Sequence, residues 1–383
     1  MNEENISRMN SEKFSKILKD FKISLAITSY HSNRLFFLKS DNVNIKISSY
    51  KFKSPMGLYI DKDKLTIGTY TQIINFKRND KVLNQIQNGS LDDETKYTSK
   101  ILEKDKEKMK QWRNNREKEL KIIKEADTLY HLINSVTTGM INIHDIAWED
   151  NKIWMVNSTF SCLSTLDQNY NFIAEWKPAF ITNLVAQDKC HLNGMAMVNG
   201  KPKYVTTFNK SNDKDFWKKE REHNGTLIDI DTNEILLNNL IMPHSPKYYQ
   251  NNIYFSEAGT GIVFKYNLET KEKEEIVKLQ GFTRGIAFYD TFMFIGLSQV
   301  RSSDIQNPLP LTLMYNQTFS GVWIINLEDN SEVAYYRFED DVEQVYDINI
   351  IENSINPELL NDDNGLLEHI FDYKDCTNDF STT

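Results

Sequence analysis

Hydrophobic and polar positions alternate along most of the chain in short runs, which are separated by turns rich in Asn, Asp, Gly and Lys. Alternation with a period of two is typical of antiparallel β-strands, because successive side chains point to opposite faces of a sheet. The run 153–156, Ile-Trp-Met-Val, directly follows the polar turn 149–152 and is a typical example. The pattern therefore predicts an all-β protein.

A short unit recurs along the chain: a small or polar residue, an apolar run containing small residues, a polar turn and a second apolar run. The copies begin at Met56, His144, Asn193, Ser245, Arg284 and Tyr346. Once one insertion is removed, successive copies are roughly 40 to 60 residues apart, which is the period of the four-stranded blades of a β-propeller. We therefore predict a six-bladed β-propeller. A β-sandwich would explain the alternation but not the recurring start of the unit.

The two ends of the chain are expected to meet in one blade. The strand-like segments 25–28 and 35–38 have no inner strand before them, and the last copy has few strand-like runs after it. Residues 346–351 can supply the missing inner strand, and this N/C-terminal strand closure would leave the ring without an exposed inner edge. We expect one propeller domain over residues 1–383, with the blades at about 25–352.

Two segments do not fit the repeat. Residues 80–126 are helix-forming in composition and carry many charges of both signs, which predicts a long helical insertion between the second and third blades. Such an insertion is either a structural arm or lid, or a helix that binds a protein partner. Residues 353–383 are acidic, and we expect them to form a loosely packed C-terminal tail.

Composition narrows the function classes. The chain has 383 residues and a formal net charge of −9, which argues against general nucleic-acid binding, since phosphate contacts need a basic face. Its three cysteines form no disulfide framework, which favours a reducing compartment. No segment approaches the roughly 20 apolar residues of a spanning helix, and the polar N-terminus does not resemble a secretory leader. We expect a cytoplasmic protein with no nucleic-acid or membrane partner.

The positions that open each copy predict a site. In a propeller the inner strand of every blade lines the central channel, so these positions form a ring at one mouth of it. Histidines fall at this mouth in three successive blades, and imidazoles that converge with an Asp or Asn oxygen are typical of a divalent transition-metal site for Zn, Mn or Fe. The predicted ligands are His144, His191, His244, Asp145 and Asn193. Alternatively, each histidine is satisfied by backbone groups or water.

Further residues at the mouth are candidates for catalysis. Arg284, with Arg301 as a second candidate, would recognise a carboxylate or phosphate of the substrate, unless Arg284 forms an internal ion pair. Tyr346 and Glu257 are candidate general acids or bases, or alternatively hydrogen-bond partners that orient a histidine. The predicted substrate is a small molecule or peptide with an anionic group.

Several motifs in order resemble a known family. They are TGMINIHDIAW (138–148), NSTFSCL (157–163), DKCHLNGMAM (188–197), MPHSPKYY (242–249), EAGTG (257–261), QGFTRGIAF (280–288), GLSQVRS (296–302) and GVWIINL (321–327). Over roughly residues 25 to 352 the chain resembles a bacterial family of conserved hypothetical proteins with a domain of unknown function. The resemblance implies a propeller and carries over the three histidines, Arg284 and Arg301, but it implies no reaction.

Two hypotheses follow for the function. The first is a metal-dependent enzyme that acts at the channel mouth on an anionic small molecule, sugar or modified peptide. The second is a non-catalytic propeller that binds a ligand or a protein, with residues 80–126 as the contact for a protein partner. The sequence does not decide whether the protein is an enzyme.

Overall fold

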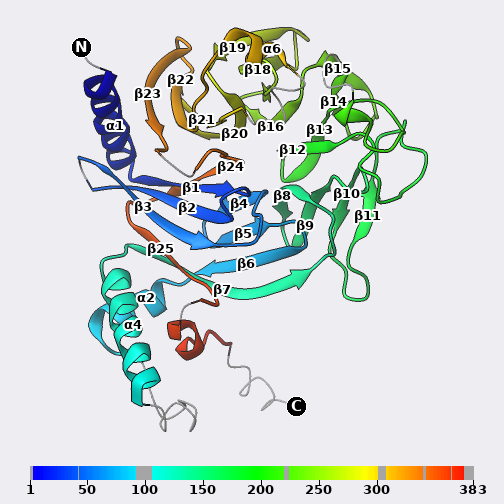
Figure 1. Cartoon of the computed structure of the whole chain (residues 1–383). Coiled ribbons are helices and arrows are strands. Elements are labelled where there is room, and N and C mark those ends of the chain that lie inside the picture. Colours follow the sequence, from blue (N-terminus) through cyan, green and yellow to red (C-terminus); the bar gives the residue numbers. More distant parts are fainter. Residues whose placement is uncertain are drawn as a thin grey trace.

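The computed structural model describes residues 3–41, 43–91, 106–219, 224–300, 308–339, 342–363 and 365–374. Its strands form six separate sheets around a common centre (Figure 1). The innermost strands of successive sheets contact one another in a closed ring. The prediction of an all-β, six-bladed propeller is confirmed, and the sandwich alternative is excluded.

Each blade is an antiparallel sheet whose first strand lies at the axis and whose fourth lies at the rim. From axis to rim, blade one contains β24 (Asp347–Glu352), β1 (Ile23–Ser29), β2 (Arg34–Ser40) and β3 (Ile45–Lys51). Blade two contains β4 (Leu58–Asp61), β5 (Lys64–Gly68), β6 (Gln72–Arg78) and β7 (Thr128–Thr137). Blade three contains β8 (Ile143–Glu149), β9 (Lys152–Asn157), β10 (Cys162–Thr165) and β11 (Ile173–Trp176). Blade four contains β12 (Leu192–Val198), β13 (Lys201–Thr207), β14 (Gly225–Asp229) and β15 (Ile235–Leu240). Blade five contains β16 (Pro243–Tyr249), β17 (Asn252–Glu257), β18 (Ile262–Asn267) and β19 (Lys273–Lys278). Blade six contains β20 (Phe282–Tyr289), β21 (Phe292–Ser298), β22 (Gly321–Asn326) and β23 (Ser331–Arg337).

Blade one joins the two ends of the chain. Its inner strand β24 comes from the C-terminal part and pairs antiparallel with β1, with Ile348 opposite Ile27. Every residue of β1 is buried, because the strand lies between β24 and β2 and packs on both faces. The expected N/C-terminal strand closure is therefore present.

The helical insertion differs from the prediction in place and in length. It leaves blade two after β6 and returns as β7, which pairs with β6, so it lies within one blade rather than between the second and third. Its described part forms two short helices, α2 (Asp80–Asn88) and α4 (Lys106–Lys124), the longer of 19 residues. The α2 helix is short because Gly89, with φ of 74°, caps its C-terminus in the left-handed conformation.

The first part of the predicted acidic tail is not loosely packed. Strand β25 (Pro357–Leu360) is fully buried and adds a parallel fifth strand to the rim of blade two, beside β7. The carboxylate of Glu358 lies 2.5 Å from Nζ of Lys39 and 2.5 Å from the hydroxyl of Tyr50, both in blade one. A buried carboxylate therefore ties β25 to a second blade. The short helix η3 (Gly365–His369) follows β25, and residues 375–383 lie outside the described residues.

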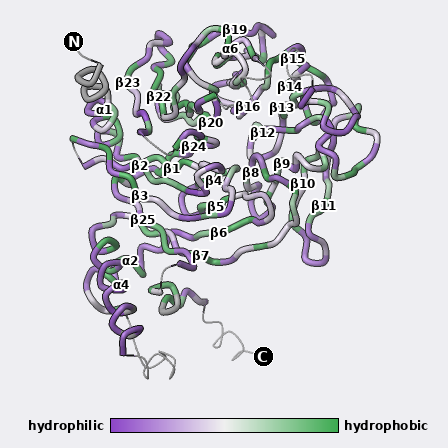
Figure 2. Tube along the Cα trace, in the orientation of Figure 1, coloured by the Kyte–Doolittle hydropathy of each residue, from purple (hydrophilic) through white to green (hydrophobic). Residues whose placement is uncertain are grey.

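The hydrophobic core lies between neighbouring blades. One cluster combines Leu25 and Ile27 of blade one with Ile324 of blade six and with Phe14 and Leu18 of α1 (Glu3–Asp20), a helix that the sequence pattern did not predict. Figure 2 shows hydrophobic residues along the strands and hydrophilic ones along most of α4. Within the described ranges, no helix has the length and apolar character needed to cross a membrane.

Candidate functional site

The three predicted histidines lie together at one mouth of the channel. The rings of His144 and His191 are nearly perpendicular, with centroids 4.8 Å apart. Phe208 contacts both His191 and His244, at centroid distances of 4.5 and 5.0 Å. Residues from blades three, four and five thus meet where the repeat placed them.

Each imidazole is oriented through its Nδ1 atom. Nδ1 of His144 lies 2.9 Å from the carbonyl oxygen of Asn142, and Nδ1 of His244 lies 2.8 Å from that of Met242. Because a carbonyl oxygen only accepts, Nδ1 carries the hydrogen in both rings and Nε2 keeps its lone pair. Nδ1 of His191 lies 2.8 Å from Oδ2 of Asp188.

Asp188 and Trp217 hold His191 from two sides. The indole Nε1 of Trp217, in η2 (Phe216–Lys218), donates to the same carboxylate oxygen at 2.9 Å, and the indole ring lies 4.0 Å from the His191 ring. Burial alone would raise the pKa of Asp188, but His191, His144 and the Trp217 donor outweigh it and lower that pKa. Asp188 is therefore a carboxylate at neutral pH and accepts the hydrogen of His191.

Arg284 is the cationic group of the mouth. Its Nη1 lies 3.0 Å from Nε2 of His244, and its guanidinium carbon lies 5.7 Å from the centre of the Tyr346 ring. Arg284 and His244 are both at least nine-tenths buried. The internal ion pair considered for Arg284 stays an alternative, and the contact described here is a hydrogen bond to a histidine.

Burial sets the protonation states at the mouth. It lowers the pKa of His144 to about 3, with a further contribution from neighbouring His191, and lowers that of His244 well below its ordinary value, with Arg284 as the second cause. Burial also raises the pKa of Tyr346 well above its usual range. At pH 7 both histidines are therefore neutral, and the Tyr346 phenol keeps its proton.

Some polar atoms at the mouth lack a hydrogen-bond partner among the described residues. In the described part of the chain, the buried Tyr346 hydroxyl and the buried Nδ2 of Asn193 form no hydrogen bond. Tyr346 is 7% exposed and Asn193 3%. A buried polar atom without a partner costs about 1 to 3 kcal/mol, so such atoms indicate a place where a ligand or water completes the structure.

Asp145 lies in the channel, one residue further along its strand than His144. Its two carboxylate oxygens accept backbone hydrogens from Ile146 and from Met195 of the next blade, at 2.8 and 2.9 Å. Nζ of Lys247 lies 3.9 Å from Asp145. The carboxylate therefore contributes to an ion pair in the channel.

Asp347 completes a charged triad with Asp145 and Lys247. Burial raises the pKa of Asp347 to about 7; Lys247 opposes this rise and Asp145 adds to it. The triad comes from blades one, three and five. In blades two, four and six the position that corresponds to Asp145 and Asp347 is a glycine, namely Gly57, Gly194 or Gly285.

The glycines are required by close packing. A Cβ atom on Gly285 would lie 2.7 Å from the backbone nitrogen of Ile348, and one on Gly57 would lie 3.0 Å from Cα of Asp145. Neighbouring inner strands are thus in backbone contact at these positions, which leaves room for side chains from alternate blades.

Of the two remaining predicted residues, Glu257 makes its contact away from the histidines and Arg301 is not described. The Glu257 carboxylate lies 3.0 Å from Nζ of Lys273 in β19, the rim strand of its own blade. This ion pair holds the Glu257 carboxylate against a side chain of the rim strand. Arg301 lies outside the described residues.

The donor set fits a metal ion in part. His144 and His191 each engage Nδ1, as metal-binding histidines do, but Nε2 of His244 accepts from Arg284. Among the described residues no three His, Cys, Asp or Glu side chains are arranged to hold a metal ion. The roles of His144, His191, His244, Asp145 and Asn193 as ligands stay a prediction.

Sequence reasoning missed Asp188, Trp217 and Lys247. Asp188 stands three residues before His191 in the same motif, and Lys247 occupies a position that is apolar in the other five copies, so both left a signal in the sequence. Trp217 lies in a connection between strands and follows no repeat.

Comparisons with known proteins agree with the fold. A chain in the crystal structure of a nidogen/laminin complex superposes with a TM-score of 0.50 at 11% sequence identity, over 86% of this chain and 99% of that one. This likeness concerns the fold alone. A search of curated proteins finds no match. The sequence profile of one family matches residues 12–101 and 95–360, which together cover most of the chain, so the protein belongs to the family described as Domain of unknown function (DUF4915).

Proposed function

We propose that the channel mouth is an active site that binds the anionic group of a small molecule or peptide and transfers a proton to or from it. The observation that carries this proposal is the pairing of a buried cation, Arg284, with a carboxylate-supported imidazole, His191, in one cluster of side chains. The two groups supply the two elements that such a reaction needs: an anchor for charge and an acceptor for a proton.

Arg284 is suited to bind an anion. Its partner His244 is neutral, so it orients the guanidinium without neutralising its charge. A guanidinium binds carboxylates and phosphates through two parallel hydrogen bonds, and a low-dielectric surrounding strengthens that attraction. The Tyr346 hydroxyl, which has no protein partner in the described structure, is a further donor beside it.

His191 is suited to accept a proton. The Asp188 carboxylate accepts a hydrogen bond from Nδ1 of His191, so the lone pair on Nε2 is available to a substrate. The carboxylate then stabilises the imidazolium that forms when Nε2 takes a proton, as in other carboxylate–imidazole pairs. His191 has φ of 47°, an uncommon backbone conformation for a residue with a side chain, and such strain often marks functional sites.

The test separates binding from chemistry. Calorimetric titration with dicarboxylates and phosphate monoesters identifies a binding anion, and Arg284→Met is expected to weaken it at least tenfold. Arg113→Met, which removes an exposed arginine of α4, is the matched control and should change nothing. An anion that binds Arg284→Met as tightly as the unmodified protein would contradict the proposal.

The proton-transfer step has its own variant. Asp188→Asn keeps the size of the side chain but removes the charge that supports His191. We expect it to retain anion binding and to lose turnover of any substrate found among the binding anions. Turnover unchanged in Asp188→Asn would show that the Asp188–His191 pair does not transfer the proton. Binding without turnover of any anion by the unmodified protein would instead favour the non-catalytic alternative.

A metal-dependent reaction is the second candidate. It is favoured by the Nδ1 contacts of His144 and His191, which leave both Nε2 atoms for a divalent ion such as Zn, Mn or Fe. Such an ion would supply Lewis-acid chemistry beside Arg284. Mass spectrometry of untagged protein tests this candidate: a stoichiometric metal that is lost in His191→Ala supports it, and trace metal in both proteins contradicts it.

A further inference from the structure

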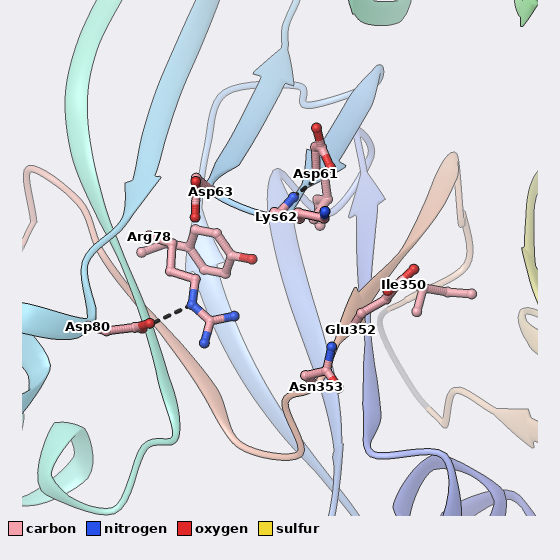
Figure 3. A pocket seen from close by; sticks show the side chains of 10 residues that line it. Asp61, Lys62, Asp63, Arg78, Asp80, Ile350, Glu352 and Asn353 are labelled. Carbon is pink, nitrogen blue, oxygen red and sulfur yellow. Dashed lines mark hydrogen bonds and ion pairs between the residues drawn. The ribbon is translucent and has the colours of Figure 1, made fainter. Parts of the chain in front are cut away.

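A cavity lies between blades one and two, at the end of the inner strands opposite to the channel mouth (Figure 3). Its walls come from the end of β24, the β4–β5 hairpin, and the start of α2 with the adjoining strands β6 and β7. It measures about 350 Å³, which is in the lower range of small-molecule sites and far larger than a single ion. The lining residues are Ile60, Asp61, Lys62, Asp63, Arg78, Asp80, Tyr130, Ile350, Glu352 and Asn353.

The cavity is predominantly acidic. Four carboxylates face two cationic side chains, and one of these cations is already engaged: Nε of Arg78 lies 2.9 Å from Oδ1 of Asp80. Figure 3 shows this pair on one wall, with Glu352 across from it and Asp61 at the hairpin. Asp61, Asp63 and Glu352 therefore leave an excess of negative charge around the cavity.

A buried tyrosine points to a ligand independently of the acids. Tyr130 is only 1% exposed and lines the cavity, and no hydrogen bond of its hydroxyl is found within the described ranges. Burial raises the pKa of Tyr130 to about 12. The charge of Arg78 opposes this rise, and those of Asp80, Asp63 and Asp61 add to it. The hydroxyl therefore lies among the charges of the cavity, protonated and without a hydrogen-bond partner among the described residues.

We propose that this cavity binds an organic ammonium ion. The carboxylates of Asp61, Asp63 and Glu352 can accept the hydrogens of a primary amine, and the Tyr130 oxygen supplies a neutral acceptor. Ile60 and Ile350 offer apolar surface for the methylene groups that carry the amine. The ammonium group belongs either to a free polyamine or to a lysine side chain of a peptide.

Binding here would act on the closure of the ring. Glu352 ends β24, the strand that joins the C-terminal part of the chain to blade one, whereas Asp61 and Asp63 belong to blade two. A ligand that contacts both walls links the closing strand to its neighbour. Because it binds the folded state alone, it raises the melting temperature of the whole protein.

Calorimetric titration and thermal unfolding of the full chain test the proposal. The probes are spermidine and N-acetyl-lysine methylamide, at low salt and at physiological ionic strength. We expect saturable one-site binding of at least one probe, together with a rise in melting temperature. Binding of spermidine alone assigns a polyamine site, and binding of the lysine derivative assigns a peptide site. If neither probe binds, the proposal is wrong.

Matched variants locate the site. Tyr130→Phe and Glu352→Gln should each weaken binding about tenfold, whereas Glu272→Gln, an exposed glutamate in the β18–β19 turn, should not. Melting curves without a probe confirm that each variant is folded. Binding that is unchanged in both cavity variants overturns the proposal. So does displacement of the amine by calcium at equal concentration, which would indicate a divalent-ion site instead.

Discussion

Nη1 of Arg284 donates a hydrogen bond to Nε2 of His244, and this contact determines which ring nitrogen of the histidine carries its hydrogen. The histidine can accept only while it is neutral, and its other nitrogen donates to the carbonyl oxygen of Met242. The buried guanidinium in turn disfavours a second positive charge on the imidazole. The Arg284–His244 pair therefore carries one positive charge, which lies on the arginine.

Removing the histidine should destabilise the protein. In His244→Ala the buried guanidinium loses an acceptor, and we expect the free energy of unfolding to fall by about 1 to 3 kcal/mol. His244→Gln retains an acceptor oxygen and should recover part of this loss. Urea unfolding measures both. Equal stability of His244→Ala and the unmodified protein would show that the contact does not hold Arg284.

His144 and His244 should resist protonation. Because burial lowers the pKa of His144 to about 3 and that of His244 well below its ordinary value, neither ring should titrate between pH 5 and 8. Nitrogen chemical shifts from NMR should report the Nδ1–H form for both. Titration of His144 near pH 6.5 would contradict the burial argument.

Asp347 should make stability depend on pH in an unusual direction. Its folded-state pKa is raised to about 7, whereas an unfolded aspartate titrates near about 4. Between these values the folded state binds more protons, so the contribution of Asp347 to stability falls as pH rises, by at most about 1.4 kcal/mol per pH unit.

The comparison with Asp347→Asn isolates this effect. The neutral histidines act in the opposite sense, because unfolding lets them take up protons below about pH 6.5. We therefore expect the difference in unfolding free energy between the two proteins, measured in urea from pH 4.5 to 7.5, to change steadily in favour of the variant. A constant difference would show that Asp347 is ionised throughout.

Glu358 should be far more important for stability than an exposed acid. It is buried against Lys39 and Tyr50, and Glu358→Ala leaves the Lys39 ammonium without its carboxylate. Removing one partner of a buried pair costs about 3 to 5 kcal/mol. The control is Lys77→Ala, whose ion pair with Asp372 is exposed and contributes about 0 to 1 kcal/mol. Similar losses in both variants would contradict this assignment.

The fold was predictable because the blade is a local unit. Each copy carries its own strand alternation and its own turn, so the period reveals the number of blades and the closure of the ring. The position of α2 and α4 was not predictable in this way. Only the pairing of β6 with β7, on either side of the helices, shows that both strands belong to one sheet.

The site was predictable where it follows the repeat. His144, Arg284 and Tyr346 open their copies and meet at the mouth, but the repeat does not say where a side chain turns. Asp145 contacts backbone nitrogens and Lys247, and Glu257 contacts Lys273. Trp217 reaches His191 from a connection between strands, and no periodic pattern describes such a contact.

The charged triad bears on how a compound could move along the channel. Lys247 reaches past blade four to Asp145, so the ion pair spans the bore at the level where glycines bring the neighbouring backbones together. If the channel mouth is the active site proposed above, this ion pair lies in the path of any compound that moves past the histidines toward the far end of the inner strands. Substrate and product would then share the entrance at the mouth, and release would compete directly with the arrival of the next molecule.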